Sequence, residues 1–156
     1  MTSPVRPTRS VQQQGLALVE AVIVLPVMLL LLLAVAEMGR ALFHYNTLHK
    51  LVRDAARYAA AVAIPDDTDV IDLSSALITT TRNLAVYGSP GASATALLPG
   101  LSVSDITVSA PDALHVRIDA DYTYTPLFVV IPSFGLGAGD ITVPTSMSAS
   151  ATMRAL

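Results

Sequence analysis

Hydrophobic residues follow three different patterns along the chain. Over residues 16–36 nearly every position is apolar and only Glu20 is charged. Over residues 37–63 apolar residues recur every three or four positions, which is the spacing of one face of a helix. Beyond Gly100 apolar and polar residues alternate, which is typical of half-buried strands. The patterns predict one continuous helix over about residues 16–63, followed by a smaller region that contains strands.

The first apolar stretch is long enough to cross a membrane. At ~1.5 Å per helical residue, residues 16–36 match the ~30 Å hydrocarbon core of a bilayer. A carboxylate such as Glu20 costs about 2.5–3.5 kcal/mol at the centre of a membrane helix and less near its ends. Pro26 removes the helical hydrogen bond to the carbonyl of Val22. We therefore predict a transmembrane segment over 16–36 with two unusual residues, and an amphipathic continuation of the helix over 37–64.

Residues 65–156 form the rest of the predicted structure, a small α+β domain. The segment 65–69, Pro-Asp-Asp-Thr-Asp, contains residues typical of a helix start, with the acids near the positive helix end. A second amphipathic helix should follow to about Val86 and end at Gly88. Residues 88–100 are rich in Gly, Pro and Ser, which indicates a loop.

Alternating segments predict three or four antiparallel strands. Residues 103–108 and 114–124 flank a turn and should pair as a hairpin. A short apolar run, 127–131, is expected to be buried, and a last alternating segment covers 141–153. The amphipathic part of the long helix should cover one face of this sheet. Its small residues allow close approach of another backbone, and they are Ala55, Ala56, Ala59, Ala60 and Ala61.

Composition and motifs exclude several function classes. The net charge is −3 without a basic run, so nucleic-acid binding has no electrostatic basis. There is no cysteine, and His44, His49 and His115 lack the spacing of a metal site. The acids at 66–72 lack the glycine and distal glutamate of a calcium loop. No catalytic motif is present, and we expect neither enzymatic activity nor a cofactor or metal.

The N-terminal tail is weakly basic and contains no acid. Met1 to Gln14 carries Arg6 and Arg9 together with two prolines, and its composition indicates a disordered segment. Basic residues ahead of an apolar run favour a cytoplasmic tail, and a long following domain is translocated largely regardless of its charge. The domain after the helix is therefore expected in the periplasm.

Gly15, followed five residues later by Glu20 at the edge of the apolar run, resembles the processing signature of type IV prepilins. In that family a membrane peptidase cuts after the glycine, which implies a new amino terminus at Leu16. The new ammonium group and the Glu20 carboxylate of a neighbouring subunit could then pair in a low-dielectric bundle of helices and set the register between subunits.

The wider pattern is similar to the TadE-like family of the tight-adherence (Tad/Flp) pilus system. The resemblance covers about residues 15–60 and weaker pieces of the tail. The residues that carry it are Gly15, Val19-Glu20, Val24-Leu25-Pro26, Glu37-x-Gly39-Arg40, Asn46, Ala55-Ala56-Arg57, Tyr87-Gly-Ser-Pro-Gly, Tyr124-Thr-Pro126 and Ser148–Arg154. Ala21 departs from the family, in which an aromatic residue is common after the glutamate.

The resemblance implies a minor pilin or pseudopilin with a pilin-like lollipop shape. Residues 1–15 would be a cytoplasmic leader, and the mature chain a single-pass protein of the bacterial inner membrane that can enter an extracellular pilus. The implied partners are a prepilin peptidase, the major Flp pilin, other minor pilins, the Tad inner-membrane assembly platform and the lipid bilayer. Priming, capping or modifying the pilus, and adhesion, are the implied roles.

A conventional signal peptide is the alternative interpretation. Ala34-Val-Ala36 is an Ala-x-Ala cleavage pattern, and a cut there would release a secreted binding or adhesive module, whereas an uncleaved helix would anchor it in the membrane. Against cleavage, the apolar run exceeds the usual ~7–15 residues of a signal peptide. It also contains Glu20 and continues into the amphipathic helix.

Overall fold

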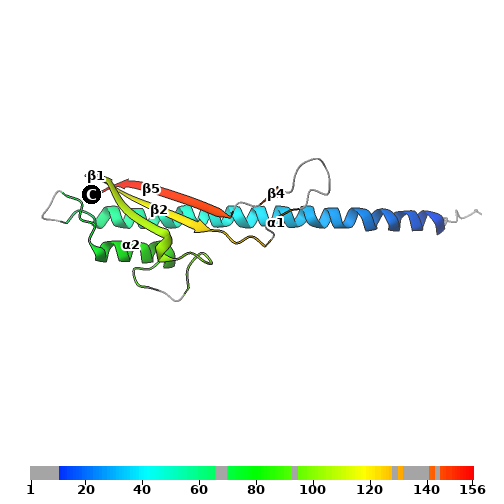
Figure 1. Ribbon diagram of the computed structural model, residues 1–156, viewed down its shortest axis with the longest axis horizontal. Coiled ribbons are helices and arrows are strands. Elements are labelled where there is room, and N and C mark those ends of the chain that lie inside the picture. Colours follow the sequence, from blue (N-terminus) through cyan, green and yellow to red (C-terminus); the bar gives the residue numbers. More distant parts are fainter. Residues whose placement is uncertain (1–10, 66–69, 93–94, 128–129, 132–140, 143–144) are drawn as a thin grey trace, which may run out of the picture.

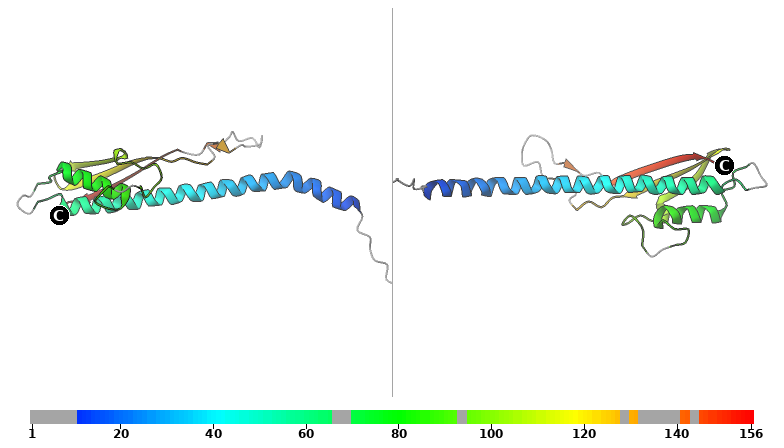
Figure 2. Two further views of the ribbon diagram at one scale, coloured as in Figure 1. Left: turned by 90° about the horizontal axis from the view of Figure 1, so that it is seen from below. Right: turned by 180° about the vertical axis from the view of Figure 1, so that it is seen from behind.

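The computed structural model describes residues 11–65, 70–92, 95–127, 130–131, 141–142 and 145–156. One helix, α1 (Val11–Val62), runs along nearly the whole length of the described structure (Figure 1). The second helix and the strands gather around its C-terminal half, while its N-terminal half projects beyond them (Figures 1 and 2). This is the predicted α+β, lollipop-like arrangement.

Helix α1 confirms the predicted continuous helix and starts earlier than expected. It contains 52 residues and begins at Val11, so a disordered tail extending to Gln14 is wrong for its last four residues. The sequence Val-Gln-Gln-Gln contains no helix breaker, and the helix continues through it and through Gly15. The rest of the predicted tail lies outside the described residues. Pro26 is inside the helix, which is visibly bent in its N-terminal part (Figure 2).

Helix α2 (Ser75–Tyr87) starts later than the predicted second helix. Its N-cap is Ser74, whose Oγ accepts a hydrogen bond from the Leu77 N–H at 3.3 Å. The expected start at the acidic segment is therefore wrong, although residues 66–69 themselves lie outside the described part. Gly88 ends the helix as predicted, in a left-handed conformation with φ 71° that glycine adopts without strain.

A three-stranded antiparallel sheet forms the other layer of the domain. It consists of β1 (Ile106–Asp112), β2 (His115–Thr123) and β5 (Ser146–Arg154) in the order β1-β2-β5. The β1–β2 hairpin was predicted, and Val108 pairs with Ile118 in it. Residues Val103–Asp105 were predicted to begin the strand, but they form a short 3-10 helix, η1, because Asp105 and Ser102 cap it reciprocally.

Two very short strands pair separately from this sheet. They are β3 (Val130–Ile131) and β4 (Ile141–Thr142), and they are antiparallel. The predicted last segment is thus divided between β4 and β5. The prediction that the run 127–131 is buried is wrong at its first residue, because Leu127 is 72% exposed. The side chains of the other four residues lie outside the described part.

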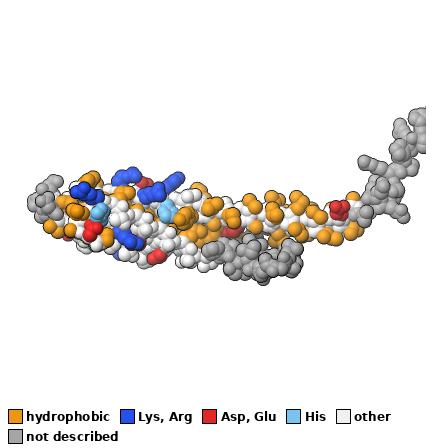
Figure 3. Space-filling model, turned by 90° about the horizontal axis from the view of Figure 1, so that it is seen from above, with side chains coloured by type: hydrophobic (Ala, Val, Ile, Leu, Met, Phe, Trp, Pro, Cys, Tyr) orange, Lys and Arg blue, Asp and Glu red, His pale blue; other side chains and the backbone are white. Residues whose placement is uncertain are grey.

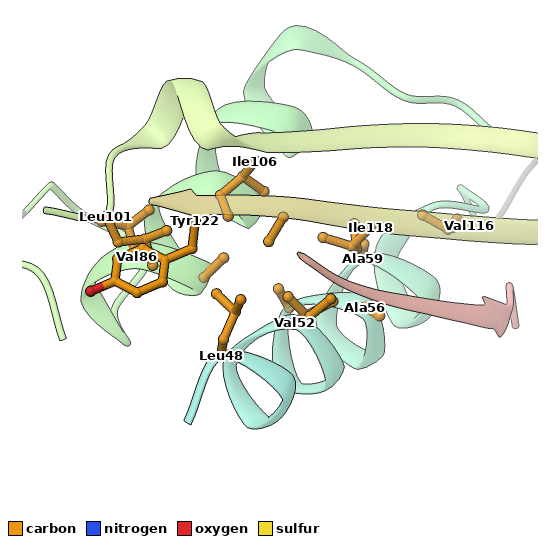
Figure 4. Packing of buried hydrophobic residues seen from close by; sticks show 14 of the residues in the cluster. Leu48, Val52, Ala56, Ala59, Val86, Leu101, Ile106, Val116, Ile118 and Tyr122 are labelled. Carbon is orange, nitrogen blue, oxygen red and sulfur yellow. The ribbon is translucent and has the colours of Figure 1, made fainter. Parts of the chain in front are cut away.

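The core lies between α1, α2 and one face of the sheet. Leu48, Val52, Ala56 and Ala59 of α1 point toward strand residues that include Ile118 (Figure 4). Four of the five alanines expected at this contact are buried, and the fifth, Ala61, is exposed. The amphipathic half of α1 therefore covers one sheet face, as predicted, and its small residues allow close packing.

Candidate functional site

The N-terminal half of α1 is exposed in the isolated chain. Over residues 17–36 no side chain is buried, although nearly all are apolar. Figure 3 shows hydrophobic side chains along this narrow part of the molecule on the face in view, with Lys and Arg gathered over the domain. Within the described residues one helix, α1, is long and apolar enough to cross a membrane. Such a surface requires lipid or neighbouring helices around it, and it suggests a membrane anchor.

The predicted site residues all lie on this part of α1. Gly15 is exposed, and a Cβ added to it would meet no atom within 4 Å, so the fold does not require glycine there. Leu16 follows in the same helix, although its side chain is outside the described part. Glu20 is exposed one turn later, and four-residue spacing places Leu16 and Glu20 on one helix face. Pro26 is exposed on another side.

No side-chain hydrogen bond or ion pair among the described residues involves Gly15, Glu20 or Pro26. Among the described residues Glu20 forms neither a hydrogen bond nor an ion pair, so its carboxylate has no partner on its own chain there. An apolar groove runs along one side of the helix at the level of Pro26, which does not line it; the lining residues are Ala21, Val24, Leu25, Met28, Leu29 and Leu32. Its apolar lining along one face of the helix fits the side chains of another helix.

A second cluster of polar residues lies where the apolar segment ends. Glu37 is only 4% exposed, although it directly follows the apolar segment. Its Oε1 accepts a hydrogen bond from the Tyr124 hydroxyl at 2.6 Å and another from the Leu127 N–H at 3.2 Å. Glu37 therefore attaches the segment after β2 to α1, although Glu37 and Tyr124 are 87 residues apart along the chain.

Arg40 strengthens the same attachment. Its guanidinium donates a hydrogen bond to the Thr125 carbonyl at 2.5 Å and lies 5.2 Å from the ring centre of Tyr124. It also lies 4.0 Å from the Glu37 carboxylate, which compensates part of that buried charge. Burial, followed by the hydrogen bond to Glu37, raises the pKa of the Tyr124 hydroxyl to about 12. Tyr124 is thus a hydrogen-bond donor at physiological pH. We call Glu37, Arg40, Tyr124 and Leu127 the junction cluster.

His44 extends the polar contacts by one more turn. Its Nδ1 lies 3.0 Å from the Tyr122 hydroxyl, which donates a hydrogen bond to the Pro99 carbonyl at 2.8 Å. Because the hydroxyl proton is used there, Nδ1 must carry the proton and donate to Tyr122. Burial, followed by the charge of Arg40, lowers the pKa of His44, so the imidazole is held neutral.

Sequence reasoning did not identify the junction cluster. Glu37, Arg40 and Tyr124 entered only as parts of a family pattern, and His44 only as a rejected metal ligand. One signal was available: Glu37 and His44 share a helical face with Leu48 and Val52, which predicts that this glutamate faces the domain. The partner residue could not be found in this way, because it comes from the distant end of β2.

Metal ligands do not gather in the described part of the chain. No group of three His, Asp or Glu side chains there could hold an ion. His115 instead contacts the Asp112 carboxylate at 2.8 Å on the exposed β1–β2 turn.

Comparison with known proteins gives one match. Residues 15–57 match the family model described as TadE-like protein. Neither a curated protein nor a solved structure matches the chain. The matched range contains Gly15, Glu20, Pro26 and the α1 residues of the junction cluster. TadE-like proteins are structural components of pili and not a family of enzymes. Residues 15–57 are therefore similar to a TadE-like protein, and a TadE-like domain implies a Tad pilus-associated protein.

Proposed function

We propose that this chain is a minor pilin or pseudopilin of a Tad (Flp) pilus. A prepilin peptidase removes residues 1–15, and the mature chain is held in the inner membrane by residues 16–36 with its domain in the periplasm. The observation that carries the proposal is the exposed apolar segment of α1, in which Glu20 is the single carboxylate between residues 16 and 36 and follows Gly15 by five residues, inside the range that matches a TadE-like domain.

The position of Gly15 supports cleavage after it. Only four residues of α1 precede this glycine, so the bond to Leu16 lies in the second turn of the helix. A peptide must be extended to enter a protease, and helix ends fray readily. Glycine lowers helix stability by about 1 kcal/mol relative to alanine. It therefore favours local unwinding at the cut and also presents no side chain to the peptidase.

The position of Glu20 supports a role in assembly. After cleavage the ammonium on Leu16 and the Glu20 carboxylate lie on one helix face, roughly 6 Å apart along the axis. In a bundle, the ammonium of one subunit pairs with the Glu20 of a neighbour displaced along that axis. Leaving one partner of such a buried pair uncompensated costs about 3–5 kcal/mol. The pair therefore selects one axial register between this chain and its neighbours, which are the major pilin and sister minor pilins.

Pro26 supports the transfer of the helix out of the bilayer. It removes one backbone hydrogen bond and bends α1 within the span, so the helix is easier to deform there. The groove lined by residues 21–32 offers an apolar surface for a neighbouring helix once lipid is replaced. The assembly platform of the inner membrane would carry out this extraction.

Two pairs of variants test the proposal in piliated cells. Gly15→Ala should block removal of the leader, whereas Gly39→Ala, also a glycine of α1 with open space around it, should be processed normally. Glu20→Gln should be processed but absent from pili, whereas Glu20→Asp should retain part of the incorporation. Normal processing of Gly15→Ala together with normal incorporation of Glu20→Gln would contradict the proposal.

The signal-peptide alternative has less support. A cut after Ala36 falls inside α1 and makes Glu37 the first residue of the remaining helix. Its new ammonium group would face the positive end of the helix dipole, which is unfavourable. The helix would also begin directly at the residue whose carboxylate holds Tyr124.

A further inference from the structure

We propose that Leu127 contacts the lipid of the periplasmic leaflet, beside the point where α1 leaves the membrane. The inference rests on the proposed anchoring of residues 16–36 in the bilayer. It adds a second membrane contact, made by the C-terminal part of the chain.

The first step is where this part of the chain is attached. Glu37 binds the Leu127 N–H, and Arg40 binds the Thr125 carbonyl, both within about one turn of the end of the apolar segment. On the return path the Tyr124 N–H donates a hydrogen bond to the Thr145 carbonyl at 2.6 Å. The chain thus leaves the domain and returns to it at one place, next to residue 37.

The second step is its direction. Figures 1 and 2 place β3 and β4 beyond the end of the three-stranded sheet, toward the apolar half of α1. The junction cluster lies directly after the proposed span, so an element on this side of the domain lies at the level of the membrane surface. The remainder of the sheet extends in the opposite direction, away from the bilayer.

The third step is the apolar character of Leu127 and of the sequence that follows it. Leu127 is 72% exposed and begins the sequence Leu-Phe-Val-Val-Ile. From residue 126 to residue 144 the sequence contains one charged residue, Asp140. Contact with lipid would remove the exposed Leu127 side chain from water.

The fourth step identifies lipid as the contact. Exposed apolar side chains continue on α1 past Glu37, at Met38 (67%) and Phe43 (66%), so the apolar surface of the span extends to the same level. Arg40 is 34% exposed there, and a cation beside apolar residues suits the phosphate groups of a membrane surface. The surface is therefore continuous with the proposed membrane span.

Single tryptophans test this contact, because the chain contains no native tryptophan. Full-length Leu127→Trp is reconstituted into nanodiscs with and without brominated lipids, which quench tryptophan only on contact. Val70→Trp is the matched control, since Val70 is 67% exposed at the far end of the domain. Leu29→Trp reports on the span itself, and Met38→Trp gives a second reporter at the level of the junction.

The expected result is a blue-shifted emission for Leu127→Trp, most of which is lost with brominated lipids, while Val70→Trp keeps its emission and is quenched by iodide. Iodide quenching of Leu127→Trp equal to that of Val70→Trp overturns the inference. Protection from both quenchers also overturns it, because protein then covers the site. When Leu127→Trp gives either of these results, the other two variants show which proposal has failed. Quenching of Leu29→Trp and Met38→Trp by brominated lipids means that the anchoring stands and only this inference fails. Absence of that quenching for Leu29→Trp means that the proposed anchoring fails as well.

Discussion

At the scale of single residues, Glu37 connects the two parts of the molecule. A carboxylate with 4% exposure is costly unless hydrogen bonds and a cation compensate it. Here the Tyr124 hydroxyl, the Leu127 N–H and Arg40 provide that compensation. The contacts with Tyr124 and Leu127 join α1 to the segment after β2, and Arg40 compensates the charge of Glu37. The junction cluster therefore sets how the domain is attached to the helix.

Replacing Tyr124 by phenylalanine removes the hydroxyl donor and leaves the buried Glu37 carboxylate with one donor fewer. A hydrogen bond to a charged group contributes about 1.5–3 kcal/mol, and we expect a loss of that size in the free energy of unfolding. Tyr45→Phe is the control, because Tyr45 is 43% exposed. Denaturant unfolding of the full-length chain in detergent measures both, and equal stability of the two variants would contradict the role of the Glu37–Tyr124 contact.

Alkaline pH should weaken the same contact. The native pKa of Tyr124, about 12, lies above the ordinary value of 10.0, so folding favours the neutral hydroxyl. The resulting stabilisation is complete below pH 10 and is lost as the pH rises from about 10 to about 12. The unfolding free energy of the wild type should therefore fall more steeply in this range than that of Tyr124→Phe. Parallel pH profiles would show that Tyr124 titrates normally in the native state.

At the scale of elements, the contact between α1 and the sheet depends on small side chains. Ala55, Ala56 and Ala59 have no exposed surface and allow the helix to approach the strands closely. A larger residue at such a position displaces either the helix or the sheet. The close approach also holds β2, and thus Tyr124 at its end, near Glu37.

Ala59→Leu should therefore destabilise the domain by about 1–3 kcal/mol, the usual cost of overpacking. Ala61→Leu adds the same side chain two residues later on the exposed side of α1 and should be within about 0.5 kcal/mol of the wild type. Thermal unfolding followed by circular dichroism compares the two variants. Similar destabilisation of both would mean that helix propensity, and not packing, determines the effect.

The elements differ in how far the sequence predicts them. The long helix and the β1–β2 hairpin follow from hydrophobic periodicity, because each buries one continuous face. The start of α2 could not be predicted, since Asp69 and Ser74 are equally good caps and tertiary contacts select between them. For the site, Gly15 and Glu20 are recognisable from local spacing. The junction cluster depends on a contact across 87 residues, which no local pattern contains.

At the scale of the whole molecule, the structure has two parts with different environments. The domain has its own core, whereas none of the apolar side chains of residues 17–36 is buried. Cutting the chain after Gly15 keeps the apolar residues 17–36 attached to the domain. Cutting it after Ala36 removes them and gives Glu37 a new amino-terminal charge. The position of the mature amino terminus therefore decides between an assembly subunit and a released domain.

The most direct test of the account is the amino-terminal residue of the mature protein, isolated from membranes or pili of cells with an active prepilin peptidase and determined by Edman sequencing or intact mass. The account predicts Leu16, and retention of the leader in cells without the peptidase. An amino terminus at Glu37 would show secretion by a conventional signal peptide. A mature chain that still begins with Met1 would show an uncleaved anchor, and either result contradicts the proposed function.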